Sequence, residues 1–117
     1  MVNTERVNMK ISELANKTSL KAINESTDKE IEGVYISDMA SDIITNAKAN
    51  VLLITLQTHK TLIAAANLID VAAIVFVKGK KPGQDIIELA SRVGIPLLST
   101  EDDTWTFASK LAKLGIQ

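Results

Sequence analysis

The segment AAIVFV, Ala72–Val77, gives the strongest indication of the fold class of this chain. It carries no polar side chain on either face, which is typical of a parallel β-strand that helices cover on both sides. Three further short apolar runs are strand candidates, namely Val34–Ile36, Val51–Leu56 and Pro96–Leu98. We therefore predict a mostly parallel β-sheet and place Ala72–Val77 at its centre.

The segments between these runs have apolar residues three or four positions apart, as amphipathic helices do. The spacing appears at Met39, Ile43 and Ala47, at Leu62, Ala65 or Ala66, and Ile69, at Ile86, Leu89 or Ala90, and Val93, and at Phe107, Leu111 and Leu114. We expect Pro82 in the first turn of the third helix, Gly94 at its end, and Thr100 as the N-cap of the fourth. The alternation predicts a single α/β domain, residues 1–117, with a mostly parallel sheet flanked by helices.

The first 32 residues have weaker patterns. We expect short strands at 6–9 and 20–24, a short helix at 12–17 and a loop at 25–30. This segment should cover one edge or end of the sheet.

Charge and hydropathy exclude several partners. Thirteen Lys and Arg against fourteen Asp and Glu give a net charge of −1, which argues against nucleic acid. The most apolar region, Leu62–Val77, contains Asn67 and Asp70 and is shorter than the ~20 apolar residues of a membrane span. Met1–Lys10 has no apolar run of the kind that a secretory signal or an anchor needs. We expect a cytoplasmic protein with no nucleic-acid or membrane partner.

Candidate binding residues follow the predicted strands, because ligands of open parallel sheets bind where strands end and helix N-termini present free N–H groups. These candidates are Ser37, Asp38, Gln57, Thr58, His59, Lys60, Lys78 and Gly79. His59 and Lys60 stand out, since the positive end of a helix dipole disfavours cations. With Lys78 after the next strand, they predict an anion site. The same residues also fit ordinary roles, Ser37 and Asp38 as helix N-caps and the basic side chains as solvated surface.

Catalytic chemistry has little support in the sequence. There is no P-loop, no G-x-G-x-x-G after a strand and no G-x-S-x-G elbow. The chain has no cysteine and one histidine, and Asp38 with Asp42 is too weak a signal for a metal site. His59 has no Ser or Cys nucleophile at a diagnostic spacing. We therefore assign no catalytic residues, no metal and no cofactor.

Four segments carry a resemblance to a known family. They are Gly33–Ile43 (GVYISDMASDI), Leu53–His59 (LITLQTH), Ile74–Gly79 (IVFVKG) and Gly94–Thr100 (GIPLLST). In these segments, within about Val7–Leu114, the chain resembles the DRTGG-domain family, whose members are similar to the N-terminal domain of HPr kinase/phosphorylase. Related domains occur as accessory domains of phosphotransacetylases and CBS-containing pyrophosphatases. The resemblance implies an α/β domain with a regulatory or binding role. It transfers no catalytic residues, and Gly79-Lys80 replaces the Gly-Gly of many relatives.

We expect a non-catalytic regulatory or sensory domain that binds a small anionic metabolite or a protein partner and forms a homodimer. Two alternatives stay open. One is a small enzyme acting on a phosphorylated substrate, with His59 as acid or base and Lys78 as charge stabiliser. The other is a structural adaptor that binds no small molecule.

Overall fold

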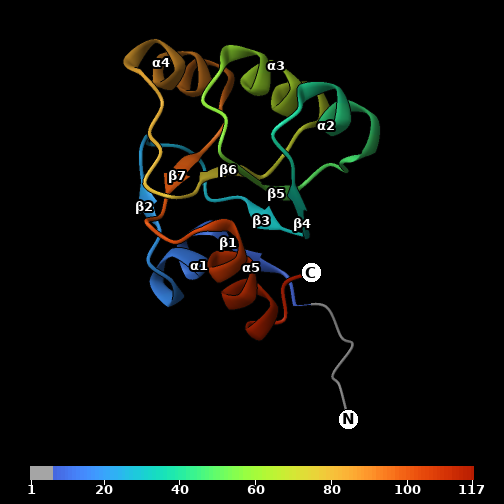
Figure 1. The fold of residues 1–117 in the computed structure, drawn as a ribbon, viewed down its shortest axis with the longest axis vertical. Helices are drawn as coiled ribbons and strands as arrows, with labels where there is room; N and C mark the ends of the chain where they lie inside the picture. Colours follow the sequence, from blue (N-terminus) through green and yellow to red (C-terminus); the bar gives the residue numbers. More distant parts are fainter. Residues whose placement is uncertain (1–6) are drawn as a thin grey trace.

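A five-stranded sheet forms the centre of the computed structural model, which describes residues 7–117 (Figure 1). Its strand order is β2-β7-β6-β5-β4. The strands are β2 (Lys21–Ala22), β4 (Gly33–Ile36), β5 (Val51–Thr55), β6 (Ala73–Phe76) and β7 (Leu97–Ser99). All neighbours pair in parallel except β2, which lies antiparallel to β7. The mostly parallel α/β fold is confirmed, and β6 is the central strand as predicted.

The helices lie in two layers, one on each face of this sheet. One layer consists of α2 (Ala40–Asn46), α3 (Lys60–Ile69) and α4 (Gln84–Val93), as Figure 1 shows. These helices connect β4, β5, β6 and β7 in sequential order, and right-handed crossovers made in one direction place every connecting helix on the same face. The other face is covered by α1 (Ile11–Lys17), α5 (Thr104–Lys113) and a small sheet of β1 (Met9–Lys10) with β3 (Glu30–Ile31).

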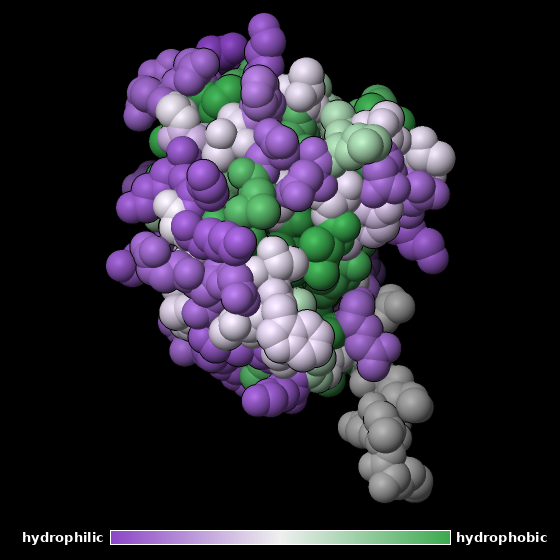
Figure 2. Space-filling view, in the orientation of Figure 1, coloured by the Kyte–Doolittle hydropathy of each residue, from purple (hydrophilic) through white to green (hydrophobic). Residues whose placement is uncertain are grey.

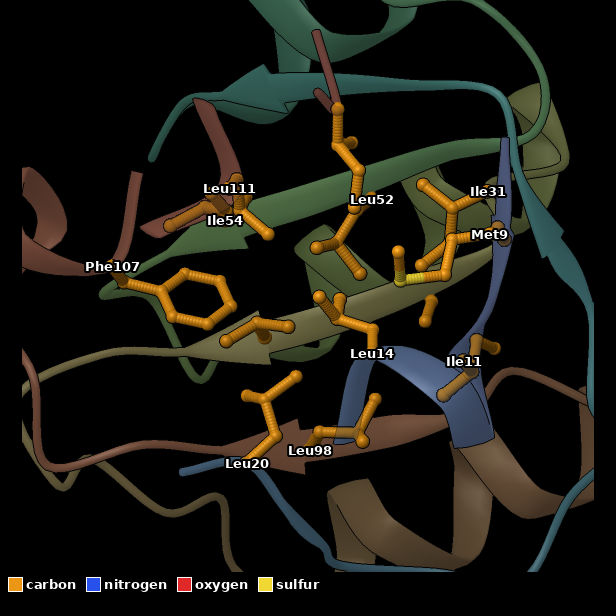
Figure 3. Packing of buried hydrophobic residues seen from close by; sticks show 14 of the residues in the cluster. Met9, Ile11, Leu14, Leu20, Ile31, Leu52, Ile54, Leu98, Phe107 and Leu111 are labelled. Carbon is orange, nitrogen blue, oxygen red and sulfur yellow. The ribbon is translucent and has the colours of Figure 1, made fainter. Parts of the chain in front are cut away.

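Two apolar cores fill the spaces between the sheet and these layers. Alternate residues of β6 enter different cores, so that Val75 packs toward α1 and α5 whereas Ile74 and Phe76 pack toward α2–α4. All residues from Ala72 to Val77 are fully buried. Figure 3 shows Leu14, Phe107 and Leu111 directed at the sheet in the first of these cores. Because an apolar core lies on each face of β6, the run Ala72–Val77 contains no polar side chain.

The N-terminal segment is largely as expected. The predicted helix is α1, and β2 lies within the expected strand 20–24. The predicted strand 6–9 is represented by β1 at Met9–Lys10, while residue 6 lies outside the described residues. The end of the expected loop 25–30 instead forms β3, because Glu30 pairs with Lys10.

Three predictions of helix starts were wrong. Asp103, and not Thr100, is the N-cap of α5, since its carboxylate accepts a hydrogen bond from the backbone N–H of Thr106 at 2.7 Å. Pro82 precedes α4, whose N-cap is Gly83. The N-cap of α2 is Met39, and neither Ser37 nor Asp38 occupies that position. The predicted end of α4 is confirmed, because Gly94 adopts a left-handed conformation with φ of 80°.

None of the described helices is long and apolar enough to cross a bilayer.

Candidate functional site

The carboxyl edge of the sheet is formed by the loops that follow β4, β5, β6 and β7. In doubly wound folds a deep crevice opens at this edge where the strand order reverses, because the flanking helices then lie on opposite faces. Here β4 to β7 follow one another without reversal. The edge accordingly has hollows between neighbouring loops in place of one central crevice.

Asp38 joins the first two loops. Its Oδ1 accepts hydrogen bonds from the Thr55 hydroxyl at 2.8 Å and from the Leu56 backbone N–H at 2.7 Å. The Thr55 hydroxyl oxygen accepts a further bond from the Gln57 backbone N–H at 3.1 Å. Asp38 therefore fixes the exit of β5 and does not cap α2, while Ser37 accepts a hydrogen bond from the Met39 backbone N–H.

A first hollow, of about 330 Å³, lies between the N-terminal ends of α2 and α3. Its walls bring together three of the predicted site residues, Asp38, Gln57 and His59, and it is completed by Met39, Ala40, Thr61 and Leu62. Within residues 7–117, Oδ2 of Asp38 makes no hydrogen bond. That carboxylate oxygen is thus available to a hydroxyl or amino group of a ligand.

A second hollow, of about 440 Å³, lies between the N-terminal ends of α3 and α4. It is lined by Thr58, His59, Lys60, Gly83, Asp85 and Ile86, so it shares His59 with the first hollow. His59 is the N-cap of α3 but its side chain forms no capping bond, and Lys60 is the first helical residue. The predicted placement of two basic side chains at this helix start is therefore observed.

Lys78 and Gly79 lie on the same sheet edge but line neither hollow. They form a tight turn, with φ of 57° and 67°, closed by a bond from the Lys80 N–H to the Val77 carbonyl. Their own N–H groups donate to the carbonyls of Asp102 and Thr100. The turn is therefore hydrogen-bonded to the β7–α5 loop, which leads to α5 in the opposite helix layer. It is not bonded to the start of α3.

The β7–α5 loop surrounds this turn with carboxylates. The pKa of Asp103 lies below its ordinary value, mainly because its carboxylate accepts the Thr106 backbone N–H, with a smaller contribution from the Lys78 charge. Asp102 accepts a hydrogen bond from the Lys110 ammonium at 2.6 Å. An anion near Lys78 would meet these negative charges, so the structure does not assemble His59, Lys60 and Lys78 into one basic site.

Chemistry at His59 would need groups that orient it. Within the described part of the chain, no acid or hydroxyl side chain is hydrogen-bonded to His59. Over the same residues, no three His, Cys, Asp or Glu side chains gather closely enough to hold a metal ion. The arrangement offers hydrogen-bond acceptors and positive charge to a ligand, without an oriented acid, base or nucleophile.

Two residues with important roles at this edge were not among the predicted ones. Thr55 is buried and its hydroxyl donates to Asp38. The signal that could have identified it is its position as the lone polar residue inside the apolar run 51–56. The Tyr35 hydroxyl donates to Asp42 at 2.9 Å, and Asn46 donates to the same carboxylate at 2.8 Å. This second contact joins residues seven apart through a strand and a helix, and periodicity alone does not reveal it.

Comparisons with protein families and with solved structures both give matches. The family model described as the DRTGG domain matches residues 10–114. The structure is similar to that of the CBS and DRTGG domains of the regulatory region of Clostridium perfringens pyrophosphatase, which was solved with its activator, diadenosine tetraphosphate. The TM-score is 0.68 at 19% identity, over 86% of this chain and 45% of the other. The chain therefore spans less than half of that structure. No curated protein matches the chain.

Proposed function

The chain belongs to the DRTGG domain family, and from this premise we propose that it is a non-catalytic regulatory domain that binds a small anionic metabolite. The proposed site is the pair of hollows that meet at His59, on the carboxyl edge of the sheet. The single observation that carries the proposal is this shared histidine, which has an acceptor-rich hollow on one side and Lys60 on the other.

The two hollows offer complementary chemistry. In the second, the Lys60 ammonium and the positive end of the α3 dipole favour a phosphate or carboxylate group, and they must outweigh the negative charge of Asp85 on the opposite wall. In the first, Oδ2 of Asp38 and the amide of Gln57 suit hydroxyl or amino groups. A ligand with both kinds of group, such as a nucleotide, fits better than a bare anion. The activator of the similar C. perfringens region, diadenosine tetraphosphate, is of this class.

A regulatory role agrees with the absence of an oriented acid or base around His59 among the described residues. It also agrees with the place of the similar domain in a regulatory region of an enzyme. A ligand that binds the folded domain stabilises it even when no reaction follows, so a regulatory role can be tested through stability. Lys78 and Gly79 are not part of this proposed site, because neither residue lines the two hollows.

The experiment is a thermal unfolding titration with diadenosine tetraphosphate, ATP and inorganic phosphate. We expect the nucleotides to raise the Tm in a saturable way, by an amount that corresponds to about 2.7 kcal/mol at a concentration of 100 Kd. The His59→Ala/Lys60→Ala variant should lose most of this rise. The matched control, Lys80→Ala/Lys81→Ala, removes two charges from the exposed loop before α4 and should keep it.

Each other outcome points away from the proposal. Equal responses from wild type and the His59→Ala/Lys60→Ala variant would place any binding elsewhere. Absence of stabilisation by all three compounds would favour an adaptor that binds no small molecule. Hydrolysis of a nucleotide by the purified chain, lost in His59→Ala, would establish the small enzyme instead.

A further inference from the structure

Thr55, the last residue of β5, is hydrogen-bonded to two residues of the first hollow but does not line the hollow itself. It is only 2% exposed. Its hydroxyl donates to Oδ1 of Asp38 at 2.8 Å, and the same oxygen accepts the Gln57 backbone N–H at 3.1 Å. One buried hydroxyl therefore holds both Asp38 and Gln57 in place at the hollow.

The two oxygens of the Asp38 carboxylate are used differently. Oδ1 accepts from the Thr55 hydroxyl and from the Leu56 backbone N–H at 2.7 Å, which occupies both of its lone pairs. Over residues 7–117, Oδ2 has no hydrogen-bond partner. An ionised carboxylate accepts hydrogen bonds and donates none, and bonds to a charged acceptor are stronger than neutral ones. The free oxygen therefore favours a ligand group that donates a hydrogen bond.

Charge gives a bound nucleotide a direction across the two hollows. Among the described residues, Asp38 but no lysine or arginine lines the first hollow, whereas Lys60 lines the second together with Asp85. A phosphate is therefore repelled from the first hollow and finds its cation in the second. In a nucleoside phosphate the sugar is bonded to the phosphate, and the base lies one group further away. The first hollow, which shares His59 with the phosphate site, consequently receives the sugar.

The base needs apolar surface to pack against, and such surface is available outside the polar part of the hollow. Met39 lines the first hollow and is 62% exposed. Figure 2 shows further hydrophobic surface between the upper helix layer and α5, on the face turned to the viewer. A base in contact with Met39 leaves Oδ2 of Asp38 to the sugar.

We propose that the first hollow recognises the hydroxyl groups of a ribose, with Asp38 as the specificity-determining residue and Thr55 as a positioning residue. This inference rests on the proposed function, because it assigns roles within the same pair of hollows. One hydroxyl donates to Oδ2 of Asp38, and the Gln57 amide, which can both donate and accept, bonds the neighbouring hydroxyl. Without the Thr55 hydroxyl, Asp38 keeps one bond at Oδ1 and the Gln57 N–H loses its acceptor.

The experiment is a calorimetric titration of the full chain with ATP and with 2′,3′-dideoxy-ATP, which have the same base and phosphates. We expect the wild type to bind ATP about tenfold more tightly or better, as one hydrogen bond to a charged group implies. In Asp38→Asn the amide oxygen can still accept from Thr55 and Leu56, but an NH2 group, which cannot accept from a hydroxyl, replaces Oδ2. This variant should lose most of the preference for ATP.

Substitutions of Thr55 test its positioning role. Thr55→Val keeps the shape of the side chain and removes the hydroxyl, so it should also lower the preference for ATP. Thr55→Ser retains a hydroxyl and should keep the preference. A role in stability alone would change the Tm of the free protein and leave the ratio of the two affinities unchanged.

Asp42→Asn is the matched control, because it removes a carboxylate charge of α2 that lines neither hollow. It should bind the two compounds with the wild-type ratio. Circular dichroism on each variant checks that it is folded.

The outcomes separate this inference from the proposed function. Saturable binding of both compounds with equal affinity by the wild type would overturn the inference and leave the proposed function standing. A preference for ATP that survives in Asp38→Asn would place hydroxyl recognition elsewhere and overturn it as well. A preference that survives in Thr55→Val would overturn the positioning role. If the wild type binds neither compound, the proposed function fails and the inference fails with it.

Discussion

At the scale of single residues, the hydrogen bond between Tyr35 and Asp42 can be observed directly, because Tyr35 is the only tyrosine. Asp42 raises the pKa of Tyr35 above its ordinary value of 10.0, since the hydroxyl donates to the carboxylate and loses that bond when it ionises. The expected ultraviolet titration of the phenol therefore has its midpoint above 10. In Asp42→Ala it should move down toward the ordinary value. An unchanged midpoint in that variant would show that the contact does not form in solution.

A second single residue, Gly79, meets two constraints at once. Its φ is 67°, and a Cβ on it would lie 2.5 Å from Oε2 of Glu101. Gly94 has a similar φ of 80° but nothing within 4 Å. We expect Gly94→Ala to lower the free energy of unfolding by about 1 kcal/mol, the cost of the left-handed conformation alone.

Gly79→Ala should cost about as much as Gly94→Ala in urea denaturation, because the new Cβ would meet only the carboxylate end of the exposed, flexible Glu101 side chain, which can move aside. Adding Glu101→Ala to Gly79→Ala should therefore change the loss little. A clearly larger loss in Gly79→Ala that Glu101→Ala relieves would contradict this expectation.

At the scale of elements, β6 is buried on both faces, so a charge on it has no route to water. Val75→Asp would place an unpaired carboxylate in the core shared with α1 and α5. The expected loss is about 5 kcal/mol or more, which equals the whole stability of a domain at the lower end of the usual range and should prevent folding. Leu68→Asp, on the exposed side of α3, should change stability by about 1 kcal/mol or less. A soluble Val75→Asp protein with cooperative melting and unchanged circular dichroism would refute the burial of β6.

The β2–β7 edge depends on one amide. Asn24 accepts from Leu97 N–H at 2.8 Å and donates to the Ile95 carbonyl at 3.0 Å, as a neighbouring strand would. Asn24→Ala leaves both groups of the β7 edge without that partner, and we expect a loss of about 1 to 3 kcal/mol. Hydrogen exchange at the Leu97 amide should accelerate in parallel. Asn16→Ala, on the exposed side of α1, is the control and should cause neither change.

At the scale of the whole molecule, several carboxylates make stability depend on pH in the acid range. Hydrogen bonds from Ser12 lower the pKa of Asp28, and those from Ser37, Asn46 and Tyr35 lower the pKa of Asp42. The pKa of Asp103 is also lowered, because its carboxylate accepts a hydrogen bond from the Thr106 backbone N–H. A lowered pKa in the folded state contributes stability above the unfolded value of 3.8, and this is lost as pH falls through the folded values.

The expected free energy of unfolding is therefore nearly constant above about pH 5 and falls steadily below about pH 4. Asp103→Asn keeps a side-chain oxygen for the α5 N-cap but removes the charge, so it should reduce the slope of that fall. Urea denaturation at a series of pH values from 7 to 2 measures both effects. A wild-type stability that does not change below pH 4 would contradict the assignment.

The fold class, the central place of Ala72–Val77, the apolar faces of the helices and the end of α4 at Gly94 could all be predicted from the sequence. These follow from local chemistry, because a continuous apolar run must be sheltered on both faces and a glycine readily takes a left-handed turn. The sequence also predicted that His59 and Lys60 stand at the start of a helix.

The contacts of the polar residues at the strand ends could not be predicted from the sequence and are known from the folded structure. The position of Asp38 before a predicted helix favours an N-cap role. In the structure it instead accepts hydrogen bonds from Thr55 and Leu56, because β5 lies beside β4. Lys78 follows β6 and His59 follows the neighbouring strand β5. The backbone N–H of Lys78 nevertheless donates to the Asp102 carbonyl in the β7–α5 loop, which ties the turn to that loop. The edge pairing of β2 with β7 likewise joins Lys21 to Ser99. The same reason applies to Asp38, Lys78 and Lys21. Their hydrogen-bond partners are distant in sequence and come within hydrogen-bond distance only when the chain folds.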